Sequence, residues 1–256
     1  MNAMVRPVPV GFDYVLILEW LSEGDARTGA ELHEFLRTIG FRSEVIVCHS
    51  WPHIQQALMA ARDAADAKGI PIVHFETHGA NLWVGDPAAG IGFGPNLDST
   101  PVWARLGPLL APLNVRTGFR LLVVAAACWG SGIIAAIDAG EHPAPFACAV
   151  GLRTAVTEGR LREAMRELYR RLRDRLPLIE CVDSVQRELE DGQELRLEVI
   201  VDVAMRMLAT LCHRRRVALI GPLRWRRNTR LVWNAWFPPS LQAQVPAYRF
   251  ENIDPM

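Results

Sequence analysis

The stretch Leu121-Leu-Val-Val-Ala-Ala-Ala127, continued by Cys128-Trp-Gly-Ser-Gly132, decides the fold class of this 256-residue chain. Its first seven residues are uniformly apolar and have the length of a strand that is buried on both faces. The glycines Gly130 and Gly132 then turn the chain into a short predicted helix over 133–139. A uniformly apolar strand that leads into a helix is typical of a parallel sheet covered by helices.

Similar apolar runs occur on both sides of this stretch and are separated by helical patterns. Strands are predicted at 14–18, 45–48, 70–75, 121–127, 146–150 and 217–220. A helix is predicted over 28–39, where Thr28 and Glu31 have the spacing of a capping box and Gly40 ends the helical pattern. The alternation predicts an α/β, three-layer fold with a mostly parallel six-stranded sheet and helices on both faces.

The end of the chain differs from this pattern. Gly221 and Pro222 stop the last predicted strand, and the residues after them combine tryptophans with arginines. We therefore divide the chain into one domain over 1–222 and a Trp- and Arg-rich C-terminal extension over 223–256. The extension is expected to pack on the domain or to dock a partner, with tryptophans covering apolar surface and arginines keeping their charged ends in water.

The composition excludes several classes of protein. Hydrophobic residues make up 50% and charged residues 22%, as in globular proteins, and 28 basic residues balance 28 acidic ones. No overall field therefore draws the chain to nucleic acid or membrane, and no nucleic-acid partner is expected. The uncharged run over 121–137 is shorter than the roughly 20 residues of a membrane-spanning helix, so no membrane span is expected.

The cysteines and the first residues bear on the compartment. Five cysteines are scattered without a CxxC pair, which predicts neither a disulfide framework nor a cysteine zinc site. The first residues lack the charged-then-apolar order of a signal peptide. Together these features predict a reduced, cytoplasmic protein.

Two predicted strands end in residues that can carry chemistry. One ends Ile72-Val-His-Phe-Glu-Thr-His-Gly79, and the next ends at Cys128. Because ligands bind at the carboxyl ends of strands in open parallel sheets, neighbouring strands would place His78 beside Cys128. Free cysteine is among the most buried residue types, so an inert buried thiol is the alternative for Cys128.

A cysteine and a histidine at these positions suit acyl transfer. The thiolate is the nucleophile, and an imidazole can take its proton and later protonate the leaving amine. The short helix after Gly132 would direct its positive end towards Cys128. Gly79 allows a close approach of backbone to backbone, so the N–H groups of Gly79 and Cys128 are the predicted oxyanion donors.

The two motifs resemble those of a known family. HFETHG at 74–79 and AAACWGSG at 125–132 are similar to the His-Gly and Ala-Cys-x-Ser-Gly motifs of CHAT domains, which belong to the caspase, metacaspase and separase clan of cysteine peptidases. The segment 149–154 and the later helix that holds Tyr169 also resemble the CHAT segment after its fifth strand. The separation of about 50 residues between His78 and Cys128 is that of the caspase His and Cys.

This resemblance implies a caspase-like sheet and a catalytic dyad of Cys128 and His78 that hydrolyses peptide bonds without a metal or organic cofactor. It also implies a regulated protease that acts in bacterial defence or programmed cell death. The expected partners are a protein or peptide substrate and an activating partner protein.

Three further residues are candidates for substrate binding. Glu76 is expected near the rim of the site or orienting a neighbour. Ala126 stands where metacaspases carry an acidic residue that binds a basic P1 side chain, so a basic P1 preference is not predicted from this position. Arg153, on the side of the fifth strand, would meet an acidic P1 side chain or form a local salt bridge, and the local salt bridge is favoured.

Two other functions are compatible with these residues. A catalytically silent module would keep the caspase fold as a scaffold for protein interactions. A metal-dependent hydrolase would use His74, Glu76 and His78, which alternate along one strand and therefore share one face. Adjacent positions on one strand rarely converge on an ion without a further ligand, and the sequence suggests none, so no metal site is expected.

Overall fold

A computed structural model describes residues 12–81, 91–95, 103–118, 120–136, 145–152, 155–176, 178–189 and 197–199. The strand predicted at 217–220 and the extension over 223–256 lie outside the described residues, as does Arg153. The described residues therefore cover most of the predicted domain and both motifs.

The main sheet has the strand order β2-β1-β3-β6-β7-β8. Its strands are β1 (Tyr14–Trp20), β2 (Ser43–Val47), β3 (Pro71–Thr77), β6 (Leu122–Ala126), β7 (Cys148–Leu152) and β8 (Leu197–Val199). The first five in this order pair in parallel, and β8 pairs antiparallel with β7. The prediction of an α/β fold with a parallel sheet is confirmed, and the first five predicted strands correspond to β1, β2, β3, β6 and β7.

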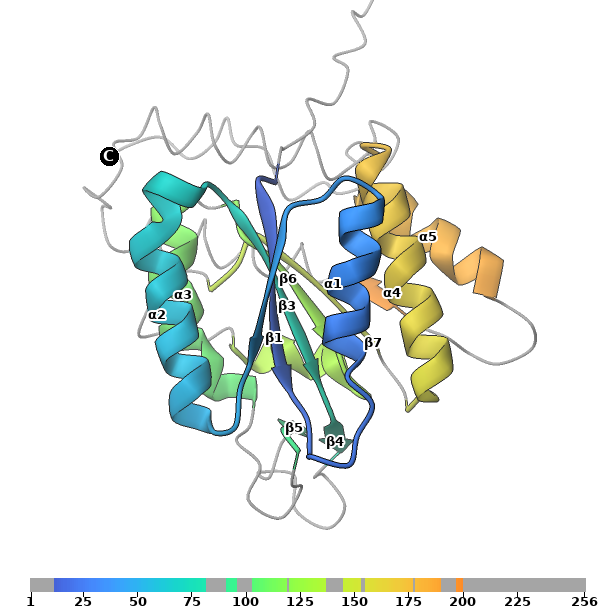
Figure 1. The fold of residues 1–256 in the computed structure, drawn as a ribbon, viewed down its shortest axis with the longest axis horizontal. Coiled ribbons are helices and arrows are strands. Elements are labelled where there is room, and N and C mark those ends of the chain that lie inside the picture. Colours follow the sequence, from blue (N-terminus) through green and yellow to red (C-terminus); the bar gives the residue numbers. More distant parts are fainter. Residues whose placement is uncertain are drawn as a thin grey trace, which may run out of the picture.

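Helices cover both faces of this sheet and give three layers (Figure 1). One layer holds α2 (Trp51–Lys68) and α3 (Gly107–Arg116), and the other holds α1 (Thr28–Thr38), α4 (Glu158–Arg173) and α5 (Leu178–Leu189). A small antiparallel pair, β4 (Gly79–Asn81) and β5 (Ile91–Phe93), follows β3, and two 3₁₀ helices, η2 (Trp103–Leu106) and η3 (Gly130–Ala136), precede α3 and follow β6. None of the helices within the described ranges combines the length and apolar character needed to cross a bilayer.

The start of α1 differs from the expected capping box. Thr28 is already helical, and its hydroxyl donates to the Glu76 carboxylate at 2.7 Å instead of capping the helix. The free N–H groups of the first turn, those of Gly29 and Ala30, donate to the buried carboxylate of Glu19 in β1 at 2.9 and 3.3 Å. The predicted capping box is therefore wrong, because a carboxylate from the sheet satisfies the helix start.

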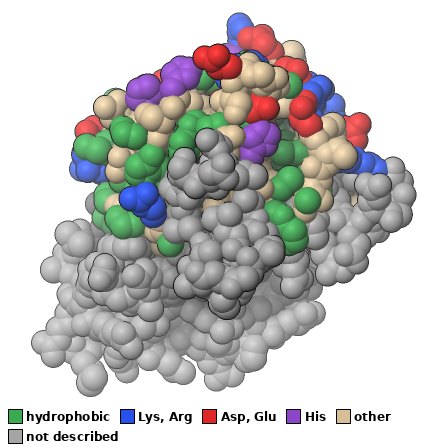
Figure 2. Space-filling model, turned by 90° about the horizontal axis from the view of Figure 1, so that it is seen from below, with side chains coloured by type: hydrophobic (Ala, Val, Ile, Leu, Met, Phe, Trp, Pro, Cys, Tyr) green, Lys and Arg blue, Asp and Glu red, His purple; other side chains and the backbone are tan. Residues whose placement is uncertain are grey.

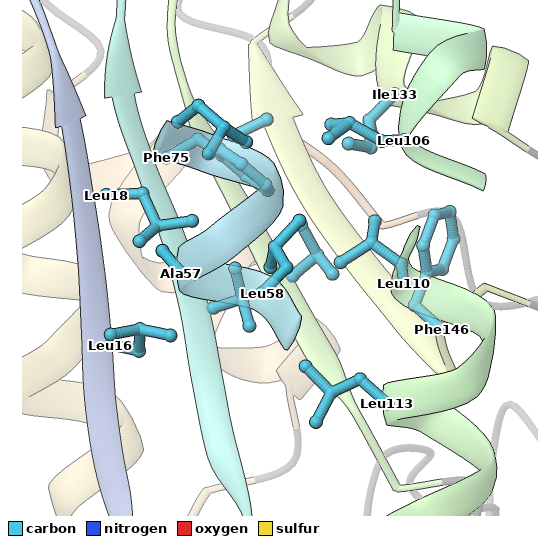
Figure 3. Packing of buried hydrophobic residues seen from close by; sticks show 14 of the residues in the cluster. Leu16, Leu18, Ala57, Leu58, Phe75, Leu106, Leu110, Leu113, Ile133 and Phe146 are labelled. Carbon is cyan, nitrogen blue, oxygen red and sulfur yellow. The ribbon is translucent and has the colours of Figure 1, made fainter. Parts of the chain in front are cut away.

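Two hydrophobic clusters lie on the two faces of the sheet. On the α2–α3 side, Leu16, Leu18 and Phe75 point from the strands towards residues such as Leu58 and Leu110 (Figure 3). On the α1–α4–α5 side the strands contribute aliphatic residues that pack on buried residues of the three helices. The alternation of side chains along β3 thus sends Phe75 into one cluster and its neighbours His74 and Glu76 towards the other face.

Candidate active site

The carboxyl ends of β3 and β6 bring the two motif residues to the same level of the sheet. These strands are adjacent and parallel, and their last paired residues are Glu76 and Ala126. His78 and Cys128 each follow two positions later. The predicted neighbourhood of the two strand ends is confirmed. Figure 2 looks onto this edge of the sheet, where histidine and acidic side chains lie beside a hydrophobic area.

The backbones of the two motifs are in direct contact at Gly79. A Cβ placed on Gly79 would lie 1.6 Å from the carbonyl oxygen of Cys128 and 3.3 Å from the Ala127 side chain. No other residue type fits there without separating the strand ends. The close backbone approach predicted for Gly79 is confirmed, whereas its role as an oxyanion donor stays a prediction.

The turn after Cys128 is tightly packed. Trp129 has a φ of +57°, a left-handed conformation that is strained for a bulky residue. A Cβ on Gly130 would lie 2.2 Å from the Ala125 carbonyl oxygen, and one on Gly151 would lie 2.5 Å from the backbone of Gly130. These contacts hold the turn between β6 and β7.

The helix expected after this turn has a different form. The structure has the 3₁₀ helix η3 (Gly130–Ala136), which begins two residues after Cys128 and three residues before the predicted start at 133, while 137–139 lie outside the described residues. Gly130 and Gly132 therefore lie inside the first turns of the helix and do not precede it.

The Cys128 side chain contacts the segment that leads into α4. Its thiol donates to the Val156 carbonyl oxygen at 3.6 Å, and its sulfur accepts the Val156 N–H at 3.5 Å. Thr157, the next residue, caps α4 by accepting the Arg160 N–H. The Cys128 sulfur therefore lies beside the segment at which α4 begins.

Cys128 differs from the other cysteines within the described residues. It is partly exposed, whereas Cys48, Cys148 and Cys181 are buried. Burial raises the pKa of Cys48 and of Cys181 to about 12 and that of Cys148 well above the ordinary value for a thiol. The three buried thiols therefore stay neutral and unreactive at neutral pH, and only Cys128 among the four is accessible.

His78 is half exposed and contacts a carboxylate that the sequence did not suggest. Its Nε2 lies 2.8 Å from Oδ2 of Asp25, in the loop between β1 and α1. The same Oδ2 accepts the Ser22 N–H at 2.7 Å. The hydrogen bond from His78 is the main reason why the pKa of Asp25 is below its usual value. The one feature of the sequence that could have indicated Asp25 is its position in the loop after β1, the strand next to β3.

The structure does not join the two dyad side chains directly. No hydrogen bond links His78 and Cys128, although both are among the described residues. Their partners belong to the loop before α1 and the segment before α4, and these two helices lie in the same layer.

Glu76 lies in the interior and not at the rim. It is 5% exposed and accepts hydrogen bonds from Thr28 Oγ1 at 2.7 Å and from His74 Nε2 at 2.8 Å. His74 Nδ1 lies 3.0 Å from the hydroxyl of Tyr169, which is also buried. Of the two alternatives stated for Glu76, orienting a neighbour fits this contact with His74.

The remaining candidates have no accessible surface or are not described. Ala126 is fully buried in the sheet, and Arg153 lies outside the described residues. A role of Glu76, Ala126 or Arg153 in substrate binding stays a prediction. A small pocket does lie beside Glu76, between α1 and α4, and Arg162 and Arg166 line it.

His74, Glu76 and His78 do not converge. His74 and Glu76 bond to each other, while His78 turns to Asp25. In the described part of the chain, no group of three or more His, Cys, Asp or Glu side chains could hold a metal ion. This arrangement gives no support to the metal-dependent alternative.

Comparison with known proteins adds no assignment. No protein-family model matches the sequence, and no curated protein matches it.

Proposed function

We propose that the protein is a caspase-like cysteine endopeptidase with a CHAT-type domain over 1–222, in which Cys128 is the nucleophile and His78 the general acid–base. The observation that supports this proposal is the register of β3 and β6, which ends both motifs at one level with Gly79 packed on the Cys128 carbonyl. The partial exposure of Cys128 and of His78 is also consistent with it, because a substrate must reach both.

The chemistry assigns one task to each group. The His78 imidazole takes the thiol proton, and the Cys128 sulfur attacks the carbonyl carbon of the scissile peptide bond. The N–H groups of Gly79 and Cys128 stabilise the oxyanion. His78 then returns the proton to the leaving amine, and a water molecule hydrolyses the thioester by the reverse sequence. The Cys128 sulfur must leave Val156 for this attack.

The biological setting of this activity belongs to the same proposal. The protease is cytoplasmic, is controlled by an activating partner protein and cleaves a protein substrate in bacterial defence or programmed cell death. The contact of Cys128 with Val156 fits a regulated enzyme, since the sulfur must leave Val156 before catalysis.

The separate partners of His78 and Cys128 favour one alternative. A catalytically silent module with the caspase fold would not need His78 and Cys128 to meet, and in this structure each side chain has another partner. The two functions differ in whether the thiol of Cys128 is required.

A peptide-library cleavage profile tests the proposal. The wild type should cleave a defined set of peptides, Cys128→Ala should abolish cleavage, and His78→Gln should lower its rate by roughly 10²- to 10⁴-fold. Ser131→Ala, in the same turn, is the matched control and should retain cleavage. If cleavage survives Cys128→Ala, the proposal is wrong; if the cellular effect survives this change and no peptide is cleaved, the protein is the silent module.

A further inference from the structure

We infer that Asp25 is a positioning residue for His78, whose carboxylate holds Nε2 of the imidazole and leaves Nδ1 to exchange the proton with the Cys128 sulfur. The inference rests on the proposed function and deepens it. It adds Asp25 to a site for which the motifs supply only His78 and Cys128.

The contact is part of a closed set of hydrogen bonds. Asp25 Oδ2 lies 2.8 Å from His78 Nε2 and accepts the Ser22 N–H at 2.7 Å. The Ser22 hydroxyl donates to the Pro95 carbonyl oxygen at 3.2 Å, and the Gly94 N–H donates to the His78 carbonyl oxygen at 3.0 Å. The imidazole of His78 thus contacts the loop that holds Ser22 and Asp25, and its backbone contacts the segment that holds Gly94 and Pro95. These two segments are also hydrogen-bonded to each other.

The fold brings Asp25 to this place. β1 and β3 pair in parallel up to Trp20 and Thr77, so the loop after β1 leaves the sheet next to His78. Thr77 Oγ1 donates to the Trp20 carbonyl oxygen at 2.9 Å and fixes the two strand ends to each other. The pairing of β1 with β3 therefore places the loop that carries Asp25 beside His78, and the short Asp25 side chain spans the remaining gap.

The hydrogen bond selects one tautomer of His78. A carboxylate accepts, so Nε2 carries the proton and Nδ1 has the free electron pair. The proton then moves from the Cys128 thiol to Nδ1, which leaves a thiolate and an imidazolium whose Nε2–H donates to the Asp25 carboxylate. When the leaving amine takes the proton from Nδ1, the starting tautomer is restored.

The exposure of the pair limits its contribution to folding. The Asp25 and His78 side chains are 30% and 49% exposed, and exposed ion pairs contribute little to stability. Asp25→Asn should therefore leave the folded protein intact, while Asn can donate to Nε2 and favour the wrong tautomer. The substitution separates positioning from stability.

The first experiment asks whether the pair exists in solution, with no need for activity. A carboxyl NMR titration of the wild type should give a pKa of Asp25 below the usual value, because protonation breaks the hydrogen bond from His78. In His78→Ala this pKa should rise towards the usual value. An unchanged pKa of Asp25 in His78→Ala would overturn the inference even if the protein is a peptidase.

The second experiment asks whether the pair serves catalysis. With the best peptide from the library, Asp25→Asn should lower kcat by roughly 10²-fold with little change in KM; buried orienting carboxylates contribute up to about 10⁴-fold. Glu23→Gln removes the same charge from an exposed position in the same loop and should leave both constants within about twofold. Equal kcat values for Asp25→Asn and Glu23→Gln would overturn the inference.

The two experiments fail in different ways. A normal titration of Asp25 with cleavage that depends on Cys128 and His78 would reject the positioning role and keep the peptidase. A lowered pKa of Asp25 that depends on His78, in a protein whose cleavage survives Cys128→Ala, would reject Cys128 as the nucleophile and leave the Asp25–His78 pair as a surface contact.

Discussion

The two faces of the sheet have interiors of different kinds. The α2–α3 face is mostly apolar and includes an aromatic group in which the Phe93 and Trp103 rings stack 4.3 Å apart and Phe75 packs edge-on against both. The α1–α4–α5 face has mostly aliphatic packing and also the buried chain of hydrogen bonds from Tyr169 through His74 and Glu76 to Thr28. One strand, β3, supplies both kinds of side chain.

This difference suggests that one face mainly stabilises the fold and the other mainly positions the site. Apolar packing has little directional preference, whereas a buried hydrogen bond forms only at one geometry. The buried chain links β3 to α1 through Thr28 and to α4 through Tyr169. These helices begin at the segments that contact His78 and Cys128, so we expect the polar face to set the position of the site and the aromatic face to supply stability.

The largest effect on stability is expected on the aromatic face. Phe75→Ala should lower the free energy of unfolding by about 3–5 kcal/mol, because it removes a buried ring and leaves a cavity beside Phe93 and Trp103. Urea denaturation measures this loss. A loss below about 1 kcal/mol would mean that the aromatic face does not support the fold.

A smaller loss with a different consequence is expected from Glu76→Ala. This change leaves the hydroxyl of Thr28 and the ring nitrogen of His74 without their buried acceptor, at a cost of about 2–3 kcal/mol. It should also lower peptide cleavage in the fraction that remains folded, which Phe75→Ala should not do. Equal cleavage per folded molecule in both variants would remove the distinction between the faces.

The smallest effect is expected from Tyr169→Phe. It keeps the buried ring and removes one hydrogen bond to His74, so the loss at neutral pH should be about 1 kcal/mol. Burial raises the pKa of Tyr169 well above its usual value. Above about pH 10 the unfolded chain loses this proton while the folded protein keeps it, and stability falls as the pH rises.

Urea denaturation of the wild type and of Tyr169→Phe across this range measures the effect. The variant lacks the ionisable group, so its stability should fall less steeply above about pH 10. Identical slopes would show that Tyr169 is not buried as a neutral phenol.

The sequence pattern predicts the sheet well because most of its strands consist largely of apolar residues. The runs at 14–18, 45–48 and 121–127 each became a parallel strand with bounds shifted by a few residues. The two strand-end motifs also pointed to the correct edge, since parallel strands expose their carboxyl ends together.

The errors arise where a distant part of the chain supplies a partner. The capping box at Thr28 failed because Glu19 and Glu76 come from neighbouring strands, and no local pattern shows this. Asp25 was missed for the same reason, since its contact with His78 depends on the pairing of β1 with β3. Of the two alternatives for Glu76, a position at the rim was wrong because every residue of β3 is buried, whereas orienting a neighbour fits its contact with His74.

The most direct test of the central claim is the rate at which iodoacetamide labels each cysteine of the native protein, followed by mass spectrometry. Cys128 should react far faster than the buried Cys48, Cys148 and Cys181, and His78→Ala should slow Cys128 at least about tenfold at neutral pH. A Cys128 labelling rate that is the same with and without the His78 imidazole would contradict a Cys128–His78 pair.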